Sequence, residues 1–114
     1  MTIYKRIRLT KEELARLRRE CEGYVWAAVD PRKCVISIWD DYLSDMRDML
    51  IVRRCRLEDI YGIGLDLTSG EIKYVPQINR RNPTVDKHGE PTDKQKEEIE
   101  ETIHYFFDKL PIMR

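Results

Sequence analysis

The sequence predicts a single α+β domain, in which a single layer of three helices packs on an antiparallel sheet of about four or five strands. Three observations lead to this fold class. Two pairs of β-prone segments each flank a short turn, two helices begin with a capping pattern, and no low-complexity tract divides the 114 residues. A chain of this length buries roughly two-thirds of the surface that its unfolded form exposes, which suits one core. We therefore expect one domain over residues 1–114.

The segment from Tyr61 to Asn79 carries the clearest strand pattern and is expected to form the central hairpin. Apolar residues alternate with glycine or charged residues in both arms, a period of two that gives each strand one apolar face. Between the arms, Ser69-Gly70 supplies the positive φ that a hairpin turn requires. A lone strand pair is marginally stable in water, so further strands and helices should cover this one.

The N-terminal region predicts an edge strand followed by a helix. A weak alternation of apolar and charged residues over Ile3 to Leu9 favours a short edge strand, whose charges oppose unwanted pairing. Thr10 and Glu13 form a capping box that begins a helix, and Gly23 is well placed to end it.

A second hairpin and a second helix are expected next. Two apolar runs, Tyr24 to Asp30 and Cys34 to Asp40, flank a turn at Pro31-Arg32-Lys33. Apolar residues on both faces of these runs are typical of central strands. Asp40 or Asp41 can then cap a helix that continues through Arg53. One stripe of this helix would carry Tyr42, Met46, Met49 and Leu50, although Met49 to Val52 also fits a strand.

The C-terminal region predicts a loop and the last helix. The stretch from Arg80 to Asp93 contains two prolines, a glycine and mixed charge without a period, so it should form a long loop. Thr92 and Gln95 form the second capping box. The helix that they begin should cover one face of the sheet with its apolar stripe, which comprises Ile99, Ile103, Phe106, Phe107 and Leu110, and Pro111 should end it.

Composition excludes several classes of protein. The 21 basic and 21 acidic side chains cancel, so no global field favours nucleic acid or a membrane. The N-terminus lacks the apolar core of a signal peptide, and no run approaches the ~20 apolar residues that span a bilayer. The sequence thus indicates a cytosolic protein. Three widely spaced cysteines, Cys21, Cys34 and Cys55, fit reduced and buried thiols better than a disulfide framework.

Several segments resemble a small prokaryotic family of uncharacterised proteins, classified as a domain of unknown function. The resemblance covers most of the chain. It rests on AAVD, a charged turn and VISI (Ala27 to Ile38), on the segment DMLIV, on LEDIYGIGLDL (Leu57 to Leu67), and on QIN before a basic loop that contains proline. Typical members have a Gly-Gly-Glu-Leu-His segment where this chain has Trp39-Asp40-Asp41-Tyr42-Leu43. The resemblance therefore implies a fold but no catalytic residue and no substrate.

Arginines flank the central hairpin and form the main candidate binding site. Arg53, Arg54 and Arg56 precede the hairpin, whereas Arg80 and Arg81 follow it. The outer ends of a hairpin lie side by side, so the two groups are expected to meet at one end of the sheet and to attract phosphate or carboxylate.

An aromatic residue adds a second component to this candidate site. Tyr61 lies near the same end of the predicted hairpin, and an aromatic ring beside arginines can stack a nucleic-acid base. Nearby acids, Glu58, Asp59 and Asp86, could instead neutralise the arginines.

Carboxylates offer weaker candidates. Asp40, Asp41 and Asp45 come closest to a metal site, but helix capping explains two of them, and no EF-hand loop is present. Glu58 and Asp59 would need burial to act as acid and base. His88 and His104 have no partner at the spacing of a triad or a zinc site. We therefore assign no catalytic residue, metal or cofactor.

The sequence favours binding over catalysis. The first hypothesis is a protein-interaction module or homodimer in which Tyr24, Trp26, Trp39 or Tyr42 presents apolar surface to a partner. The alternative is anion or RNA binding through the arginine cluster, and a second alternative is a hydrolytic enzyme that uses the carboxylates near Glu58. The partner, the ligand and the oligomeric state stay open.

Overall fold

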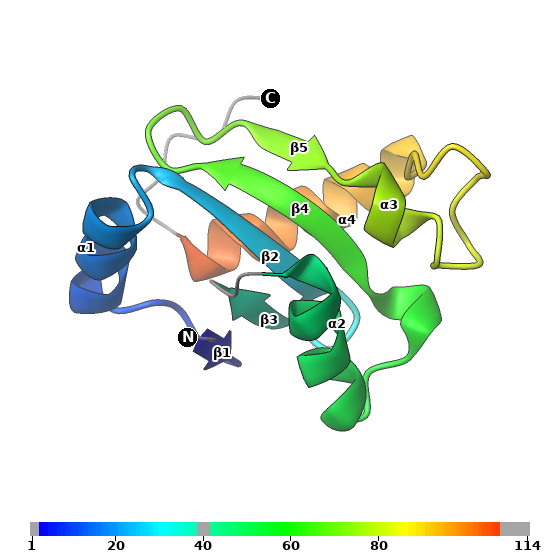
Figure 1. The fold of residues 1–114 in the computed structure, drawn as a ribbon, viewed down its shortest axis with the longest axis horizontal. Coiled ribbons are helices and arrows are strands. Elements are labelled where there is room, and N and C mark those ends of the chain that lie inside the picture. Colours follow the sequence, from blue (N-terminus) through cyan, green and yellow to red (C-terminus); the bar gives the residue numbers. More distant parts are fainter. Residues whose placement is uncertain (1–2, 39–41, 108–114) are drawn as a thin grey trace.

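The computed structural model describes residues 3–38 and 42–107, which form one five-stranded antiparallel sheet with helices around it (Figure 1). The α+β class and the antiparallel sheet predicted from the sequence are confirmed. The strand order is β1-β3-β2-β4-β5. The strands are β1 (Ile3–Lys5), β2 (Tyr24–Asp30), β3 (Val35–Ile38), β4 (Tyr61–Asp66) and β5 (Ile72–Tyr74). The helices are α1 (Lys11–Glu20), α2 (Leu43–Val52), α3 (Pro76–Asn79), α4 (Asp93–Phe106) and the short 3-10 helix η1 (Leu57–Asp59).

The central hairpin forms at the predicted turn. Ile63 pairs with Tyr74 and Leu65 pairs with Ile72, and Gly70 has a φ of 79°. The carboxylate of Asp66 accepts hydrogen bonds from the backbone N–H groups of the two residues before Gly70, at 2.8 and 3.0 Å. These bonds lower the pKa of Asp66 below its usual value, because they stabilise the ionised carboxylate.

The second arm of this hairpin is shorter than predicted. Strand β5 ends at Tyr74, and Pro76–Asn79 forms the single helical turn α3. Pro76 occupies the first turn of α3, where its fixed φ and missing N–H suit a helix start and would interrupt a strand ladder.

Beyond the end of β5, two asparagine side chains bond the chain to the backbone around the start of β4. Asn79, which is fully buried, accepts the N–H of Gly62 at 2.7 Å and donates to the carbonyl of Gly62 at 3.2 Å. Asn82, also buried, donates to the carbonyls of Glu58 and Ile60 at 2.9 and 3.1 Å. The loop after α3 is therefore joined to the start of β4 by side-chain amides.

We expect Gly62→Ala to lower the free energy of unfolding by about 1–3 kcal/mol. An added Cβ would lie 2.9 Å from the Cβ of Ile78, an atom that cannot move without the backbone of α3. Gly64→Ala is the matched control on the same strand, because its added Cβ meets the ends of the Tyr24 and Trp26 side chains, which can rotate away. Urea unfolding of both variants tests the prediction, and an equal loss in the two would contradict it.

Both predicted capping boxes are present. Thr10 and Glu13 cap α1, and Thr92 and Gln95 cap α4, each with reciprocal side-chain and backbone hydrogen bonds. Met49 to Val52 is helical, because these residues complete α2.

The start of the second helix differs from the prediction at Tyr42, and its predicted caps lie outside the described residues. Tyr42 precedes α2 without a capping hydrogen bond and is 67% exposed, so it does not belong to the buried stripe of this helix. The proposed caps Asp40 and Asp41, together with Trp39, lie outside the described residues, as do Leu110 and Pro111.

Helices cover both faces of the sheet, whereas the sequence suggested a single layer. Successive strand residues point to opposite faces. Ala27 belongs to a larger apolar cluster with residues of α4, and Ala28 belongs to a smaller cluster with Met46 and Leu50 of α2. Because residues 27–30 of β2 and all of β3 are buried on both sides, each face needs a helical cover.

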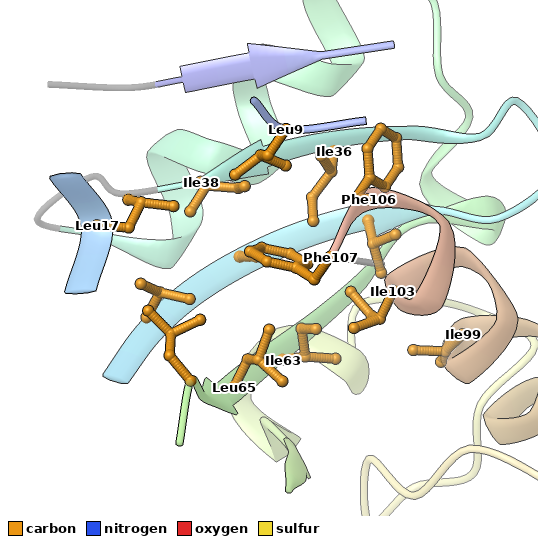
Figure 2. Close-up of a cluster of buried hydrophobic side chains, with 14 of the residues drawn as sticks. Leu9, Leu17, Ile36, Ile38, Ile63, Leu65, Ile99, Ile103, Phe106 and Phe107 are labelled. Atoms are coloured by element: carbon orange, nitrogen blue, oxygen red, sulfur yellow. The ribbon is translucent and has the colours of Figure 1, made fainter. Parts of the chain in front are cut away.

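The larger cluster lies between the sheet and α4 (Figure 2). Ile99, Ile103 and Phe106 of α4 are fully buried in it beside Ile36 and other strand residues. The N–H of Leu9 donates to the carbonyl of Phe106 at 3.1 Å. The segment after β1 and the end of α4 are thus joined directly.

None of the helices in the described ranges has the length and apolar character needed to cross a bilayer. The three cysteines are free thiols, of which Cys55 is buried and Cys21 and Cys34 are partly buried. Burial of all three was predicted, and it is confirmed in full only for Cys55.

Candidate functional site

A surface concavity of about 530 Å³ lies where the end of α2 meets β1 and the β2–β3 turn. We call it the basic concavity. Its lining residues are Tyr4, Arg6, Lys33, Val35, Val52, Arg53 and Arg54. Among the described residues, the lining includes four basic side chains and no acidic one. Several basic residues elsewhere on the described surface, namely Lys5, Arg16, Arg32, Arg47, Arg56 and Lys96, form ion pairs with carboxylates.

Two of the cations are held in place by contacts other than ion pairs. The guanidinium of Arg53 lies over the ring of Tyr4, 4.1 Å from its centroid, a cation–π contact. Lys33 Nζ donates to the carbonyl of Arg54 at 2.6 Å. Within the described chain, none of the four basic side chains pairs with a carboxylate. Their positive charge is therefore available to a ligand.

The end of α2 sets the position of Arg54. The N–H of Cys55 donates to the carbonyl of Leu50 at 3.0 Å, and the N–H of Arg54 donates to that of Ile51 at 2.9 Å. This pair of bonds is the Schellman motif, which normally places glycine where Arg54 lies. Arg54 has a φ of 70°, in the left-handed region that a side chain disfavours. An arginine at this position is consistent with a role in binding rather than in stability.

We expect Arg54→Gly to raise the free energy of unfolding by about 1 kcal/mol, because glycine adopts the left-handed conformation without steric cost. Arg53→Gly is the matched control, since Arg53 has a φ of −91° and gains nothing from glycine. Urea midpoints measure the difference. A lower midpoint for Arg54→Gly than for the unsubstituted protein would contradict the expectation.

The β2–β3 turn sets the position of Lys33. Its backbone N–H donates to Oδ1 of Asp30 at 3.0 Å, and Cys34 follows with a φ of 53°. Asp30 is fully buried, and its Oδ2 has no hydrogen-bond partner among the described residues.

Burial raises the pKa of the Cys55 thiol from 9.0 to about 12, and the hydrogen bond and negative charge of Asp30 add to this shift. Cys55 is therefore a neutral packing residue rather than a nucleophile. A thiol whose pKa is higher in the folded state than in the unfolded state stabilises the fold. This stabilisation is complete below the unfolded-state pKa and is lost as the pH rises through the folded-state pKa.

We accordingly expect the protein to lose stability between pH 9 and about 12, and Cys55→Ala to lose less over the same interval. Thermal unfolding in that range, compared with pH 8, measures the effect. Equal losses in the two proteins would show that Cys55 does not contribute.

The structure brings together only part of the predicted arginine cluster. Arg53 and Arg54 line the basic concavity. Arg56 instead pairs with Asp59 at 2.9 Å, and Arg80 Nε donates to a backbone carbonyl of its own helical turn at 3.3 Å. Arg81 is exposed beyond α3 and does not line the concavity.

Tyr61 does not fit the predicted role of stacking a base. It is 6% exposed and belongs to the larger apolar cluster, so no face of its ring is open to a ligand. Alternation along β4 directs Tyr61 toward the side of the sheet that α4 covers, which explains the difference.

The carboxylates near Glu58 form an ion-pair network with Arg32 and Arg56. Asp59 pairs with Arg56 and, at 3.6 Å, with Arg32, while Glu58 pairs with Arg56 at 3.3 Å. The side chain of Glu58 is 42% exposed, whereas that of Asp59 is 14% exposed and pairs with Arg56. In the part of the chain that the structure describes, no group of three His, Cys, Asp or Glu residues could hold a metal ion.

Sequence reasoning missed Tyr4, Arg6, Lys33 and Val52 as site residues. They come from three separate segments, and only the sheet and the end of α2 bring them together. Searches of family models, of curated proteins and of solved structures find no match to this chain. The functional assignment therefore depends on the geometry of the basic concavity.

Proposed function

We propose that this protein binds a phosphate or carboxylate anion in the basic concavity. The observation that supports the proposal is the collection of four basic side chains, with no acidic side chain among the lining residues that the structure describes. The C-terminal end of α2 opposes an anion with about half a negative charge. Four positive side chains outweigh that charge, so the local field favours an anion.

The arginines match this function in chemistry as well as charge. A guanidinium group presents several N–H donors in a plane and can donate two hydrogen bonds to one phosphate or carboxylate. Arg53 is already oriented by the ring of Tyr4, and the backbone before and after Arg54 is fixed by the end of α2. Orientation before binding reduces the entropy lost on binding. The proposed function is binding without a chemical step.

Calorimetric titration with inorganic pyrophosphate and with short single-stranded RNA tests the proposal. At low salt we expect both to bind, with an affinity that falls linearly with salt concentration on a logarithmic scale. If neither pyrophosphate nor RNA binds at low salt, the proposal is wrong.

A second candidate function is association with a protein partner or a second copy of this chain. The observation in its favour is the exposure of large apolar side chains on and before α2, namely Tyr42 at 67%, Ile51 at 42% and Val52 at 80%. Trp26 on β2 is also 45% exposed. Sedimentation velocity at high protein concentration tests self-association, and a monomer throughout would exclude the homodimer.

A further inference from the structure

We propose that the anion is a single-stranded nucleic acid, and that two neighbouring concavities hold two successive nucleotides. This inference rests on the proposed function, because it assigns a ligand class to the same basic concavity. It uses a second feature of the surface, which lies along β1.

The second concavity, of about 520 Å³, is lined by Tyr4, Lys5, Arg6 and Ile7. We call it the edge concavity, because β1 is the outermost strand of the sheet. Tyr4 and Arg6 line both concavities. The two are therefore adjacent, and one ligand can occupy both while contacting Arg6 between them.

Each concavity combines positive charge with one exposed apolar side chain. Val52 is 80% exposed in the basic concavity, and Ile7 is 65% exposed in the edge concavity. A simple inorganic anion would use the charges and leave both side chains in water. A nucleotide carries a charged phosphate and a base with an apolar face, so it can cover the apolar side chain as well.

The distribution of charge fits a chain of nucleotides better than separate ones. Lys5 forms an ion pair with Glu13 at 2.9 Å, whereas Arg6 forms no ion pair with a residue in the described ranges. Because Arg6 also lines the basic concavity, we place the phosphate that joins two nucleotides at Arg6. The outer phosphate then meets Arg53 and Arg54.

Four ligands test the inference by calorimetry at low salt: pyrophosphate, uridine monophosphate, a uridine tetranucleotide and a pentaglutamate peptide. We expect the tetranucleotide to bind at least about tenfold more tightly than the mononucleotide, because its second base can cover the exposed Ile7 side chain. Equal affinity of the two nucleotides, or equal affinity of pentaglutamate and the tetranucleotide, would overturn the inference and leave anion binding intact. Failure of all four ligands to bind would overturn the proposed function itself.

Three variants locate the bases on the surface. Ile7→Ser should weaken the tetranucleotide about tenfold and leave the mononucleotide unchanged, whereas Val52→Ser should weaken both nucleotides. Ile51→Ser is the matched control, because Ile51 is an exposed residue of α2 that does not line either concavity. A loss with Ile51→Ser as large as with Val52→Ser would contradict the placement. Thermal unfolding of each variant verifies that the fold is retained.

Discussion

Phe106→Ala is expected to lower the free energy of unfolding by about 3–5 kcal/mol. Phe106 is fully buried in the larger cluster, where it lies with Ile36 and Ile103 between α4 and the sheet (Figure 2). Truncation to alanine removes the transfer free energy of the ring and leaves a cavity that the surrounding side chains fill only in part. Small domains are stable by about 5–15 kcal/mol, so this single change removes a large fraction of the total.

Urea unfolding followed by circular dichroism measures the loss. Tyr105→Ala is the matched control, because Tyr105 is the neighbouring aromatic residue of α4 but is only partly buried against the cluster. We expect its substitution to cost clearly less. A loss below about 1 kcal/mol for Phe106→Ala would contradict the role of α4 as the cover of this face.

Arg6→Gln combined with Arg54→Gln is expected to weaken binding of the uridine tetranucleotide about a hundredfold or more. A hydrogen bond to a charged group contributes about 1.5–3 kcal/mol, and the double variant removes at least two. The dependence of affinity on salt should also fall, by a slope of about one for each lost phosphate contact. The fold should be retained, because neither side chain forms an ion pair within the described chain.

The matched control is Arg80→Gln combined with Arg81→Gln, which removes the same charge from positions outside the basic concavity. We expect little change in affinity for this variant. An equal loss of affinity in the two double variants would show that binding depends on the net charge of the protein and not on the basic concavity. The comparison also tests the original expectation that all five arginines act together.

The sequence predicted the parts of the fold that depend on local interactions. Capping boxes at Thr10 and Thr92 and the turn at Gly70 follow from residues within a few positions of one another, and all three are present. The two-sided apolar pattern of β2 and β3 indicated central strands, and both occupy interior positions in the sheet. It also implied a cover on each face, which the prediction of a single layer of helices overlooked.

The candidate site was predictable only in part, because long-range contacts decide it. Arg53 and Arg54 were predicted and do line the basic concavity. Arg56, only two residues beyond Arg54, turns instead to Asp59, because the chain reverses at the left-handed Arg54 and enters η1. Nothing in the sequence indicates that Arg6 and Lys33 lie close together, since only the β1–β3 pairing brings their segments together.

The two asparagines after β5 are another feature that sequence reasoning missed. Asn79 and Asn82 lie in or beside a stretch that reads as loop, but both are buried and hydrogen-bonded to the backbone around β4. Their significance depends on carbonyl and N–H groups about twenty positions away, which no local pattern reveals.

The position of α4 in the chain has a consequence for synthesis on the ribosome. All five strands precede α4 along the chain, yet its side chains complete the larger apolar cluster. While α4 is still inside the exit tunnel, the nascent sheet exposes the apolar face that α4 will cover. Nascent chains truncated before residue 93 should therefore be far more sensitive to protease than chains whose α4 has emerged, and they are the species on which a chaperone would act.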